Sequence, residues 1–357
     1  MKLIHCSDIH LDSPMESNLS PAQARERNAE ILATFIRMIG YARENGVEVI
    51  LLAGDLFDSR RAAKRTAQLV LDQIRQSPEV DFLYLRGNHD ETADPFSGLK
   101  LPENFKTFQK TWSSYRYGDV VITAAEPATE DWEGIYDSLE LDGRDINIVM
   151  LHGQEATQPG REKIALPRLK NRHIRYLALG HIHSHKLEKL DLEGEYAYCG
   201  CLEGRGFDEC GPKGFVLLES DGKELKIRFV PFAKRTLHHI PVDITDMITA
   251  PQILTAMQTL ASDIPGEDLV KFTLTGSYTL ETQKDPEFLE RMLEGRFYFV
   301  KIKDESRLKI RQEDYAHDVS LKGEFVRLVL ASERSEEEKE RMICWGIRAL
   351  SGEEVGL

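Results

Sequence analysis

The chain has 357 residues, 41% of them hydrophobic and 30% charged, with a formal net charge of −14 at pH 7. This composition is typical of a water-soluble protein with more than one hydrophobic core. At about 100–200 residues per domain, this length predicts two or three domains. No apolar run approaches the ~18 residues of a membrane-spanning helix, so we expect no membrane span. The chain starts directly with strand residues, so we also expect no cleavable signal. The negative net charge excludes nucleic-acid binding through the overall charge of the protein, so any such binding must be local.

Predicted strands and helices alternate through residues 1–235. Ser20-Pro21 offers an N-cap followed by a first-turn proline, and apolar residues at helical spacing between Ile31 and Ile39 predict a helix that ends at Gly46. A second helix is expected at 61–76. The later part of this region is richer in strands, which we expect at 120–124, 146–151, 196–199, 215–218 and 225–230.

The pattern changes near Lys234-Arg235. We therefore divide the chain into a catalytic domain at 1–235, a small α+β domain at 236–333 and a C-terminal helix at 334–357. In the second domain we expect helices at 251–261 and 286–293, and strands at 239–242, 270–275, 297–302 and 325–330. The terminal helix begins with three glutamates, which favour a helix N-terminus.

Five short polar motifs each follow an apolar run that is typical of a buried strand. The motifs are Asp8-Ile9-His10, Gly54-Asp55, Gly87-Asn88-His89-Asp90, His152-Gly153 and Gly180-His181-Ile182-His183. Strand ends in α/β sheets are where ligands and metals bind. The motifs therefore predict a metal site at one sheet edge, and the number of candidate ligands favours two cations.

The spacing within the motifs supports this prediction. Asp8 and His10 are two residues apart, as are His181 and His183, so each pair points one way if its segment is extended. A carboxylate can bridge two cations, and Asp55 is the natural bridge. The mixed oxygen and nitrogen ligands suit Mn²⁺, Fe²⁺ or Zn²⁺. Two cations about 3.5–4 Å apart can clamp a phosphate and activate a water for in-line attack.

In order and spacing, the five motifs resemble those of the calcineurin-like metallophosphoesterase superfamily. The resemblance implies a four-layer α/β/β/α sandwich with a small C-terminal α+β capping domain. One cation would be held by Asp8, His10, Asp55 and His183. The other would be held by Asp55, Asn88, His152 and His181. His89 would be a catalytic general acid or transition-state stabiliser, with Asp90 orienting it, although a purely hydrogen-bonding role for His89 stays open.

Within the superfamily, the chain is similar to the SbcD-type DNA double-strand-break repair nucleases. The similarity lies in the opening run from Ile4 to Leu11, in Asp55-Leu56-Phe57-Asp58, and in the stretch from Tyr198 to Glu209. One departure is Leu11-Asp12, where these nucleases commonly have Leu-Gly; with Cys199 and Cys201 it indicates a sub-branch.

The resemblance implies a cytoplasmic, Mn²⁺-dependent DNA exo- or endonuclease that acts in repair. It also implies an SbcC-type coiled-coil ATPase as a partner and a homodimer. The alternative enzyme is a phosphodiesterase or phosphatase that uses the same cations on a small nucleotide or phosphoester. A non-enzymatic adaptor is disfavoured because all seven ligand types are present, and buried Asp and His clusters are costly without a cation.

Basic side chains predict where a nucleic acid would bind, because phosphate contacts supply most of its affinity. The predicted substrate contacts are Arg60, Arg61, Lys64, Arg65 and Arg205, with residues 161–175 as a second basic stretch. A solvated surface is the competing interpretation for each.

The cysteines are few and odd in number: Cys6, Cys199, Cys201, Cys210 and Cys344. This number favours a reducing compartment over a disulfide framework. Cys199, Cys201 and Cys210 have a spacing that could hold zinc, but no second pair accompanies them, and an ordinary loop is the favoured interpretation.

Overall fold

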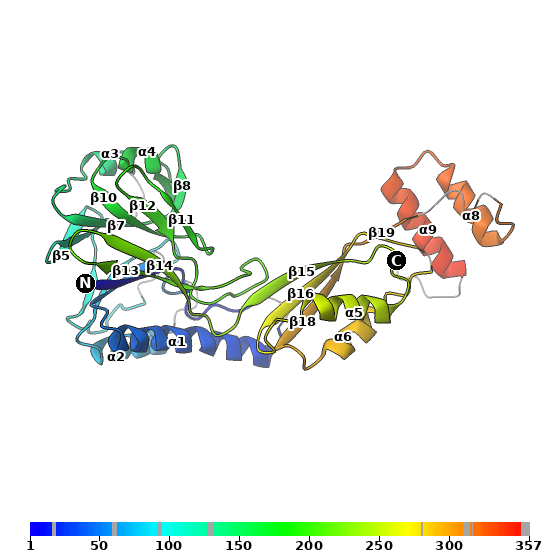
Figure 1. The fold of residues 1–357 in the computed structure, drawn as a ribbon, viewed down its shortest axis with the longest axis horizontal. Coiled ribbons are helices and arrows are strands. Elements are labelled where there is room, and N and C mark those ends of the chain that lie inside the picture. The colour runs from blue at the N-terminus through cyan, green and yellow to red at the C-terminus, as the bar shows by residue number, and fades with distance from the viewer. Residues whose placement is uncertain are drawn as a thin grey trace. The chain divides into compact units, whose positions relative to one another are not determined.

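The computed structural model describes residues 1–15, 19–58, 63–90, 95–126, 132–279, 281–309, 315 and 317–350. The chain divides into two compact units, residues 1–237 and 238–357, coloured blue to green and green to red in Figure 1. None of the helices in the described ranges combines the length and the apolar content that crossing a bilayer requires.

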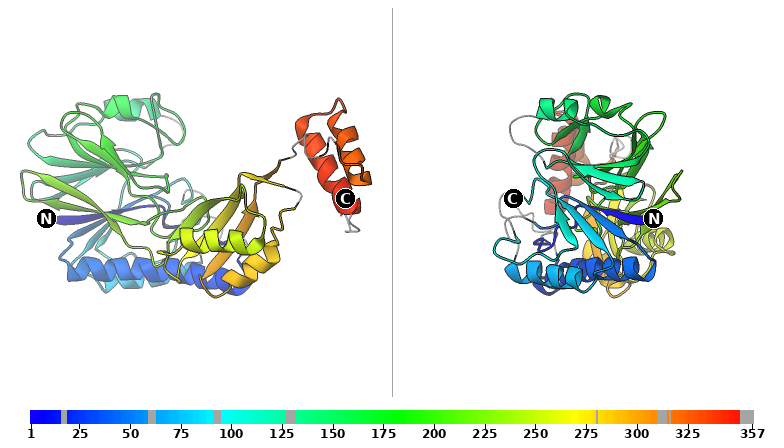
Figure 2. Two further views of the ribbon diagram at one scale, coloured as in Figure 1. Left: turned by 45° about the vertical axis from the view of Figure 1, so that its right-hand side comes forward. Right: turned by 90° about the vertical axis from the view of Figure 1, so that its left-hand side faces the viewer.

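The first unit is a four-layer α/β/β/α sandwich, as predicted (Figures 1 and 2). One sheet has the order β14 (Leu225–Pro231), β13 (Gly214–Ser220), β1 (Lys2–Cys6), β2 (Val49–Ala53), β3 (Asp81–Leu85) and β4 (Phe105–Thr107). The other has the order β11 (Lys186–Lys189), β12 (Glu195–Tyr198), β10 (Ile174–Gly180), β7 (Ile146–His152), β6 (Val120–Ala124) and β5 (Ser113–Tyr117). Neighbouring strands from β1 to β4 are parallel, as are β12, β10, β7 and β6.

Helices cover the outer face of each sheet. The first sheet carries α1 (Pro21–Glu44) and α2 (Lys64–Arg75), and the second carries α3 (Trp132–Asp137) and α4 (Leu166–Leu169). A short pair of strands, β8 (Gln154–Ala156) and β9 (Lys163–Ala165), follows β7.

Side chains that point alternately to the two faces of each sheet form three apolar layers. Ile50 on β2 packs with Phe35 of α1, whereas the next residue, Leu51, packs between the sheets with Ile148 of β7. On β10, Leu177 faces the layer of α3 and α4. Successive side chains of a strand point to opposite faces, and both faces here are covered. This explains why the predicted strands have continuous apolar runs.

The start of α1 is the one predicted. The Ser20 side chain accepts a hydrogen bond from the Gln23 N–H, the Gln23 side chain returns to the Ser20 backbone, and Pro21 is the first helical residue. Gly46 follows the helix with a φ of 64°, a left-handed conformation that ends it. The predicted helix at 61–76 begins at Lys64, and residues 59–62 lie outside the described ranges.

Asp12 contacts the start of α2 from a distant part of the chain. Its carboxylate accepts hydrogen bonds from the N–H of Ala63 (2.8 Å), the residue before the helix, and from the Thr66 hydroxyl (2.9 Å). Asp12 has a φ of 65°, in the region that glycine favours and aspartate tolerates. The departure from the Leu-Gly pattern of the nucleases therefore ties the segment after His10 to the start of α2.

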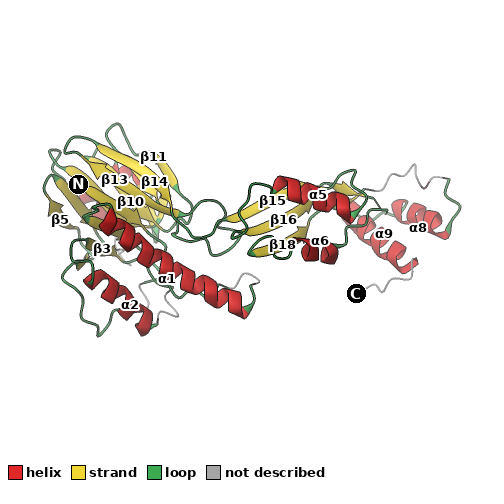
Figure 3. Cartoon of the chain, turned by 60° about the horizontal axis from the view of Figure 1, so that its bottom comes forward, coloured by secondary structure: helices red, strands yellow, loops and turns green. Residues whose placement is uncertain are grey.

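The second unit contains a three-stranded sheet with two helices against it (Figure 3). Its order is β15 (Leu237–Asp243), β16 (Leu269–Thr275) and β18 (Phe299–Asp304), and the helices are α5 (Ala250–Leu260) and α6 (Pro286–Leu293). Two short strands, β17 (Ser277–Tyr278) and β19 (Arg307–Leu308), pair with each other, and the helices α8 (Leu321–Leu330) and α9 (Glu336–Leu350) follow.

The predicted strand at 325–330 is wrong, because these residues form most of α8. Ser320 caps the helix by accepting a hydrogen bond from the Gly323 N–H, and Val326 and Val329 are buried at a helical spacing of three. These valines pack against Ile343 of α9. β-branched residues favour strands only weakly, and packing between the two helices overrides that preference.

A buried ion network ties α1 to two later segments of the first unit. The Glu30 carboxylate accepts hydrogen bonds from the side chains of Arg27, Lys234 and Arg235. Arg27 is 1% exposed and also donates to the Glu203 carboxylate (3.3 Å). A buried charge that loses its partner is strongly destabilising, so these side chains depend on one another.

We expect this network to make the fold sensitive to acid. Burial alone would raise the pKa of Glu30, but its three cationic partners outweigh burial and lower the pKa from 4.5 to about 2. The stabilisation is present above pH 4.5 and is lost as the pH falls through 2. Urea denaturation should show a declining free energy of unfolding across this window. The Glu30→Gln variant should have a lower free energy of unfolding at pH 7, and that free energy should fall less steeply with pH than in the wild-type protein. Equal slopes in the two proteins would show that Glu30 is not the group responsible for the acid sensitivity.

Candidate metal centre

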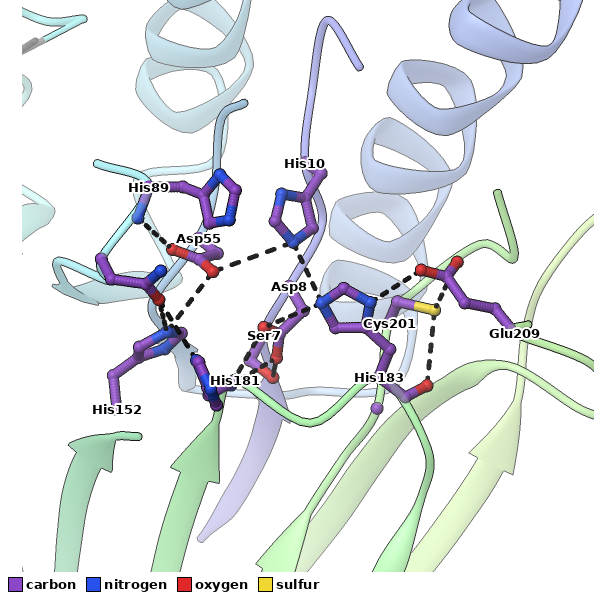
Figure 4. A network of polar contacts seen from close by, with 12 residues as sticks. Ser7, Asp8, His10, Asp55, His89, His152, His181, His183, Cys201 and Glu209 are labelled. Carbon is purple, nitrogen blue, oxygen red and sulfur yellow. Dashed lines mark hydrogen bonds and ion pairs between the residues drawn. The ribbon is translucent and has the colours of Figure 1, made fainter. Parts of the chain in front are cut away.

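The seven predicted ligands meet where the carboxyl ends of the two central sheets face each other (Figure 4). Three strands of the first sheet deliver four of them: Asp8 and His10 after β1, Asp55 after β2 and Asn88 after β3. Two strands of the second sheet deliver the rest: His152 at the end of β7, and His181 and His183 after β10. Their convergence follows from parallel strands that end at a common edge.

The segment that carries Asp8 and His10 is not extended, so the condition under which the pair would point one way by strand alternation is not met. Strand β1 ends at Cys6, and Asp8 and His10 have φ values of 51° and 49°. Asp55 and His181 also have positive φ, at 52° and 99°. Non-glycine residues in this conformation carry strain of order 1–3 kcal/mol and cluster at functional sites. Tight turns, not strand alternation, direct these side chains to the centre.

One group of ligand atoms comes from Asp8, His10 and His183. The Nε2 atoms of His10 and His183 are 3.2 Å apart, and His183 Nε2 lies 3.7 Å from Asp8 Oδ1. A cation bound at ~2.0–2.2 Å from each ligand holds neighbouring ligand atoms roughly 2.8–3.6 Å apart. The two histidine nitrogens fall within this range and the Asp8 oxygen lies just beyond it, so the three side chains surround the position of a first cation.

A second group of ligand atoms lies beside the first. His152 Nε2 is 2.9 Å from Asn88 Oδ1, and His181 Nδ1 is 3.2 Å from the same oxygen. Asp55 Oδ2 lies 3.4 Å from His152 Nε2 and 3.8 Å from His10 Nε2. The Asp55 carboxylate thus stands between the two groups, in the position that a bridging ligand requires.

Burial gives the centre unusual electrostatics. Burial raises the pKa of Asp8. Burial would also raise the pKa of Asp55, but His152 and His10 outweigh it and hold that pKa well below its usual range. Burial would lower the pKa of His152, but the Asp55 charge raises it to about 9. Carboxylates and imidazoles so enclosed need compensating charge, and this donor set fits divalent cations.

The backbone fixes the ligands in place. His152 Nδ1 donates to the Ala53 carbonyl (2.9 Å), which directs Nε2 toward Asp55. The His181 N–H donates to both carboxylate oxygens of Asp8, at 2.9 and 3.0 Å. A Cβ at Gly180 would lie 1.9 Å from the Ala53 carbonyl oxygen, so only glycine allows the two sheets to approach this closely.

His89 lies at the open side of the centre. Its backbone N–H donates to Asp55 Oδ1 (2.9 Å), its side chain is 43% exposed, and its ring centroid is 4.9 Å from that of His10. The side chain is also close enough to His10 and Asp55 to serve as a ligand. Because the His89 ring is both exposed to solvent and close to the candidate ligand His10, its position suits the predicted role in proton transfer.

The expectation that Asp90 orients His89 is wrong. The Asp90 carboxylate is buried and accepts hydrogen bonds from the N–H groups of Gly87, Leu56 and Phe57 at 3.1–3.3 Å, so it joins the loops that carry Asn88 and Asp55. The carboxylate beside the His89 ring belongs to Asp58, with Oδ1 3.7 Å from Nδ1. Asp58 belongs to the Asp55-Leu56-Phe57-Asp58 motif, which is 31 residues before His89 in the sequence. No sequence pattern near either residue predicts that the two side chains pair.

The basic residues predicted to contact the substrate differ in how exposed they are and in whether they are paired with a carboxylate. Arg60 and Arg61 lie outside the described residues, whereas Lys64 and Arg65 are exposed at the start of α2. Arg205 is only 19% exposed, and its guanidinium donates to Glu209 (2.8 Å). In the second basic stretch, Arg161 is 83% exposed, whereas Arg168 pairs with Asp137.

The cysteines take no part in the centre. Cys199 and Cys201 are buried, burial raises the pKa of both thiols, and no candidate ligand cluster among the described residues contains a cysteine. The Ser7 hydroxyl lies 3.0 Å from Cys199 Sγ and also donates to Asp8.

Residues 1–185 match the family model described as calcineurin-like phosphoesterase. The chain therefore belongs to this family of hydrolases, as its motifs predicted.

Two curated relatives are similar over 271 residues. YhaO, an uncharacterized metallophosphoesterase of Bacillus subtilis, is 26% identical, and the DNA double-strand break repair protein Mre11 of Aeropyrum pernix is 24% identical. Each match covers 69% of this chain and 64% of the relative, so the chain spans less than two thirds of their length. A solved dimetal phosphatase from Danio rerio is 10% identical with a TM-score of 0.41, covering 64% of this chain and 95% of that one.

Removal of the shared carboxylate should damage the centre most. Asp55→Ala leaves His10 and His152 with no common anion, so the protein should retain at most one of two cations. Metal analysis after Mn²⁺ loading and dialysis would measure this loss, and cleavage of a chromogenic phosphodiester should nearly vanish. Asp142→Ala, at a carboxylate paired with Arg144 on the surface, is the control. Full activity and full metal content in Asp55→Ala would refute the two-cation arrangement.

His89 should separate chemistry from metal binding. His89→Gln retains a polar side chain of similar length but cannot transfer a proton. We expect near-normal metal content with a turnover reduced about 10²–10⁴-fold, the usual effect of losing an acid–base group. Loss of a cation in this variant would instead assign His89 to the ligands, beside His10 and Asp55.

Proposed function

We propose that this protein is a two-cation phosphodiesterase that hydrolyses DNA, with Mn²⁺ as its metal and Fe²⁺ or Zn²⁺ as the alternatives. The observation that carries the proposal is the position of the Asp55 carboxylate, 3.4 Å from His152 and 3.8 Å from His10, between two sets of ligands. Bound cations would supply charge stabilisation for a phosphoryl group and an activated water.

The chain's own side chains have distinct tasks in this reaction. The Asp55 carboxylate lies between the His10 and His152 rings, Asp8 accepts the His181 backbone N–H, and Asn88 contributes a neutral oxygen between His152 and His181. His89, half-exposed beside His10, is placed to hold or donate a proton at the leaving oxygen. Asp58, near the His89 ring, is the group that would orient it.

DNA as the substrate is supported by the similarity to Mre11 and by a local basic surface. Asp12 is two residues beyond His10 and accepts hydrogen bonds from Ala63 and Thr66, so the first turn of α2 is tied to the segment that carries His10. Lys64 and Arg65 are exposed in that turn. With a net charge of −14, attraction for DNA phosphates must come from such local clusters.

The same proposal includes an SbcC-type coiled-coil ATPase as partner and a homodimer as the working form. The helix pair α8–α9 is the candidate docking element for the coiled coil, since it exposes Leu321, Leu328 and Trp345 at 69%, 67% and 43%. Exposed apolar side chains on a helix are typical of protein interfaces.

The deciding assay offers three substrates to the purified protein with Mn²⁺: linear DNA, hairpin DNA and a chromogenic phosphodiester. Cleavage of DNA that requires Asp55 supports the proposal. Hydrolysis of the chromogenic compound alone would favour the alternative enzyme for a small nucleotide or phosphoester. Hydrolysis of none of the three would overturn the phosphodiesterase function.

A charge substitution in α2 should separate DNA binding from hydrolysis. Lys64→Ala with Arg65→Ala should weaken DNA binding and reduce the slope of log affinity against log salt by about one unit per lost phosphate contact. Hydrolysis of the chromogenic phosphodiester should not change.

The matched control is Lys223→Ala with Lys226→Ala. These exposed lysines lie around the β13–β14 turn, which is next to Met1 at the opposite end of β1 from the centre. An equal effect of both double variants would show only a general loss of positive charge. No effect of the α2 variant would assign the DNA path to other residues, with 161–175 the next to test.

A further inference from the structure

One segment, residues 199–213, surrounds His183 from the side away from the other ligands. Glu209 Oε1 lies 2.7 Å from His183 Nδ1 (Figure 4). The carbonyl oxygen of His183 accepts hydrogen bonds from Lys213 Nζ (2.7 Å) and from the Cys201 N–H (3.3 Å). The ring and the backbone of this single ligand are therefore both held by the same segment.

Glu209 is itself fixed. It is 5% exposed, and its carboxylate accepts hydrogen bonds from the Arg205 N–H (2.7 Å) and from Arg205 Nη2 (2.8 Å). Cys201 Sγ lies 3.6 Å from Glu209 Oε2. A carboxylate held by a guanidinium is an acceptor only. Glu209 can therefore interact with the His183 ring only by receiving its Nδ1 hydrogen.

Arg205 offers a competing arrangement. Its Nη2 atom is 3.0 Å from His183 Nδ1, so the ring nitrogen would accept from Arg205 if Nδ1 carried no hydrogen. The hydrogen would then be on Nε2, which faces Asp8 and His10, and Nε2 would have no lone pair for a cation. The shorter contact, 2.7 Å to Glu209, favours the first arrangement, in which the hydrogens of Arg205 and His183 both point at Glu209 Oε1.

The segment cannot easily move. At its start, the Glu203 carboxylate accepts hydrogen bonds from the Thr34 hydroxyl (2.7 Å) and from Arg27 (3.3 Å), both on α1. At its end, Lys213 is 3% exposed, and its carbonyl oxygen accepts the N–H of Phe232 (2.7 Å). A ligand held by a partner on such a rigid frame is pre-organised for its metal.

We propose that Glu209 is a positioning residue of the metal centre, which receives the Nδ1 hydrogen of His183 and thereby directs Nε2 at the cation shared with Asp8 and His10. Arg205 holds Glu209 in place. The inference rests on the proposed two-cation function. Partners of this kind typically contribute 10–100-fold to metal affinity.

The first test needs no variant. Imidazole ¹⁵N chemical shifts of the metal-free protein, assigned with His183→Gln as reference, report which ring nitrogen carries the hydrogen. We expect the Nδ1–H form at a pH where the ring is neutral. The Nε2–H form would overturn the proposal, because it requires Arg205, not Glu209, as the partner of Nδ1.

The second test measures Mn²⁺ binding by calorimetry for the wild-type protein and for Glu209→Gln. We expect about a 10–100-fold weaker affinity for one of two cations and an unchanged affinity for the other. Turnover should recover toward the wild-type value at saturating Mn²⁺, which a general structural defect would not allow. Asp268→Asn is the matched control, since it also removes a buried carboxylate that pairs with a histidine, His238, but touches no predicted ligand and none of residues 199–213.

The outcomes separate the two proposals. A wild-type protein that binds no Mn²⁺ would overturn the proposed function. A wild-type protein that binds two cations, with identical affinities in folded Glu209→Gln, would overturn the positioning role alone. If circular dichroism shows Glu209→Gln unfolded, Arg205→Lys replaces it; a smaller loss of affinity for the same cation is expected, and no loss would count against the proposal.

Discussion

The Asp55 carboxylate is the point at which the two halves of the catalytic unit depend on each other. It follows β2 of one sheet, yet Oδ2 lies 3.4 Å from His152, which ends β7 of the other. Such contact requires the two sheets to approach closely at one edge, and there is no space for a side chain at Gly180, where a Cβ would lie 1.9 Å from the Ala53 carbonyl. The apolar side chains packed between the two sheets keep the sheets close together.

Bringing two carboxylates and four imidazoles into a buried edge is electrostatically costly, and the protein compensates locally. Asp55 and His152 shift each other's pKa values in opposite directions, although burial opposes both shifts. The positive φ values of Asp8, His10 and Asp55 store backbone strain in the same place. The layers around the centre hold both features in place, and a bound cation would offset the burial of the carboxylates.

Polar contacts around the ligands hold the geometry of the centre. Asp90 joins two ligand loops through three backbone N–H groups, and Glu209 with Arg205 holds the ring of His183. Glu203 anchors the segment of Glu209 to α1, where Arg27 also binds Glu30. The centre is thus connected through hydrogen bonds to the ion network that we expect to control acid stability.

The sequence by itself determined most strands and the seven candidate ligands, because continuous apolar runs followed by Asp, Asn and His are a local pattern whose meaning depends only on where parallel strands end. The four layers and the division of the ligands around Asp55 were expected from the family resemblance. Only the tertiary structure decided that Asp58 and not Asp90 lies beside the His89 ring, and that Glu209 partners His183. It also made residues 325–330 a helix. These outcomes depend on contacts between segments far apart in the chain, and side-chain pairing at such distances leaves no periodicity along the sequence.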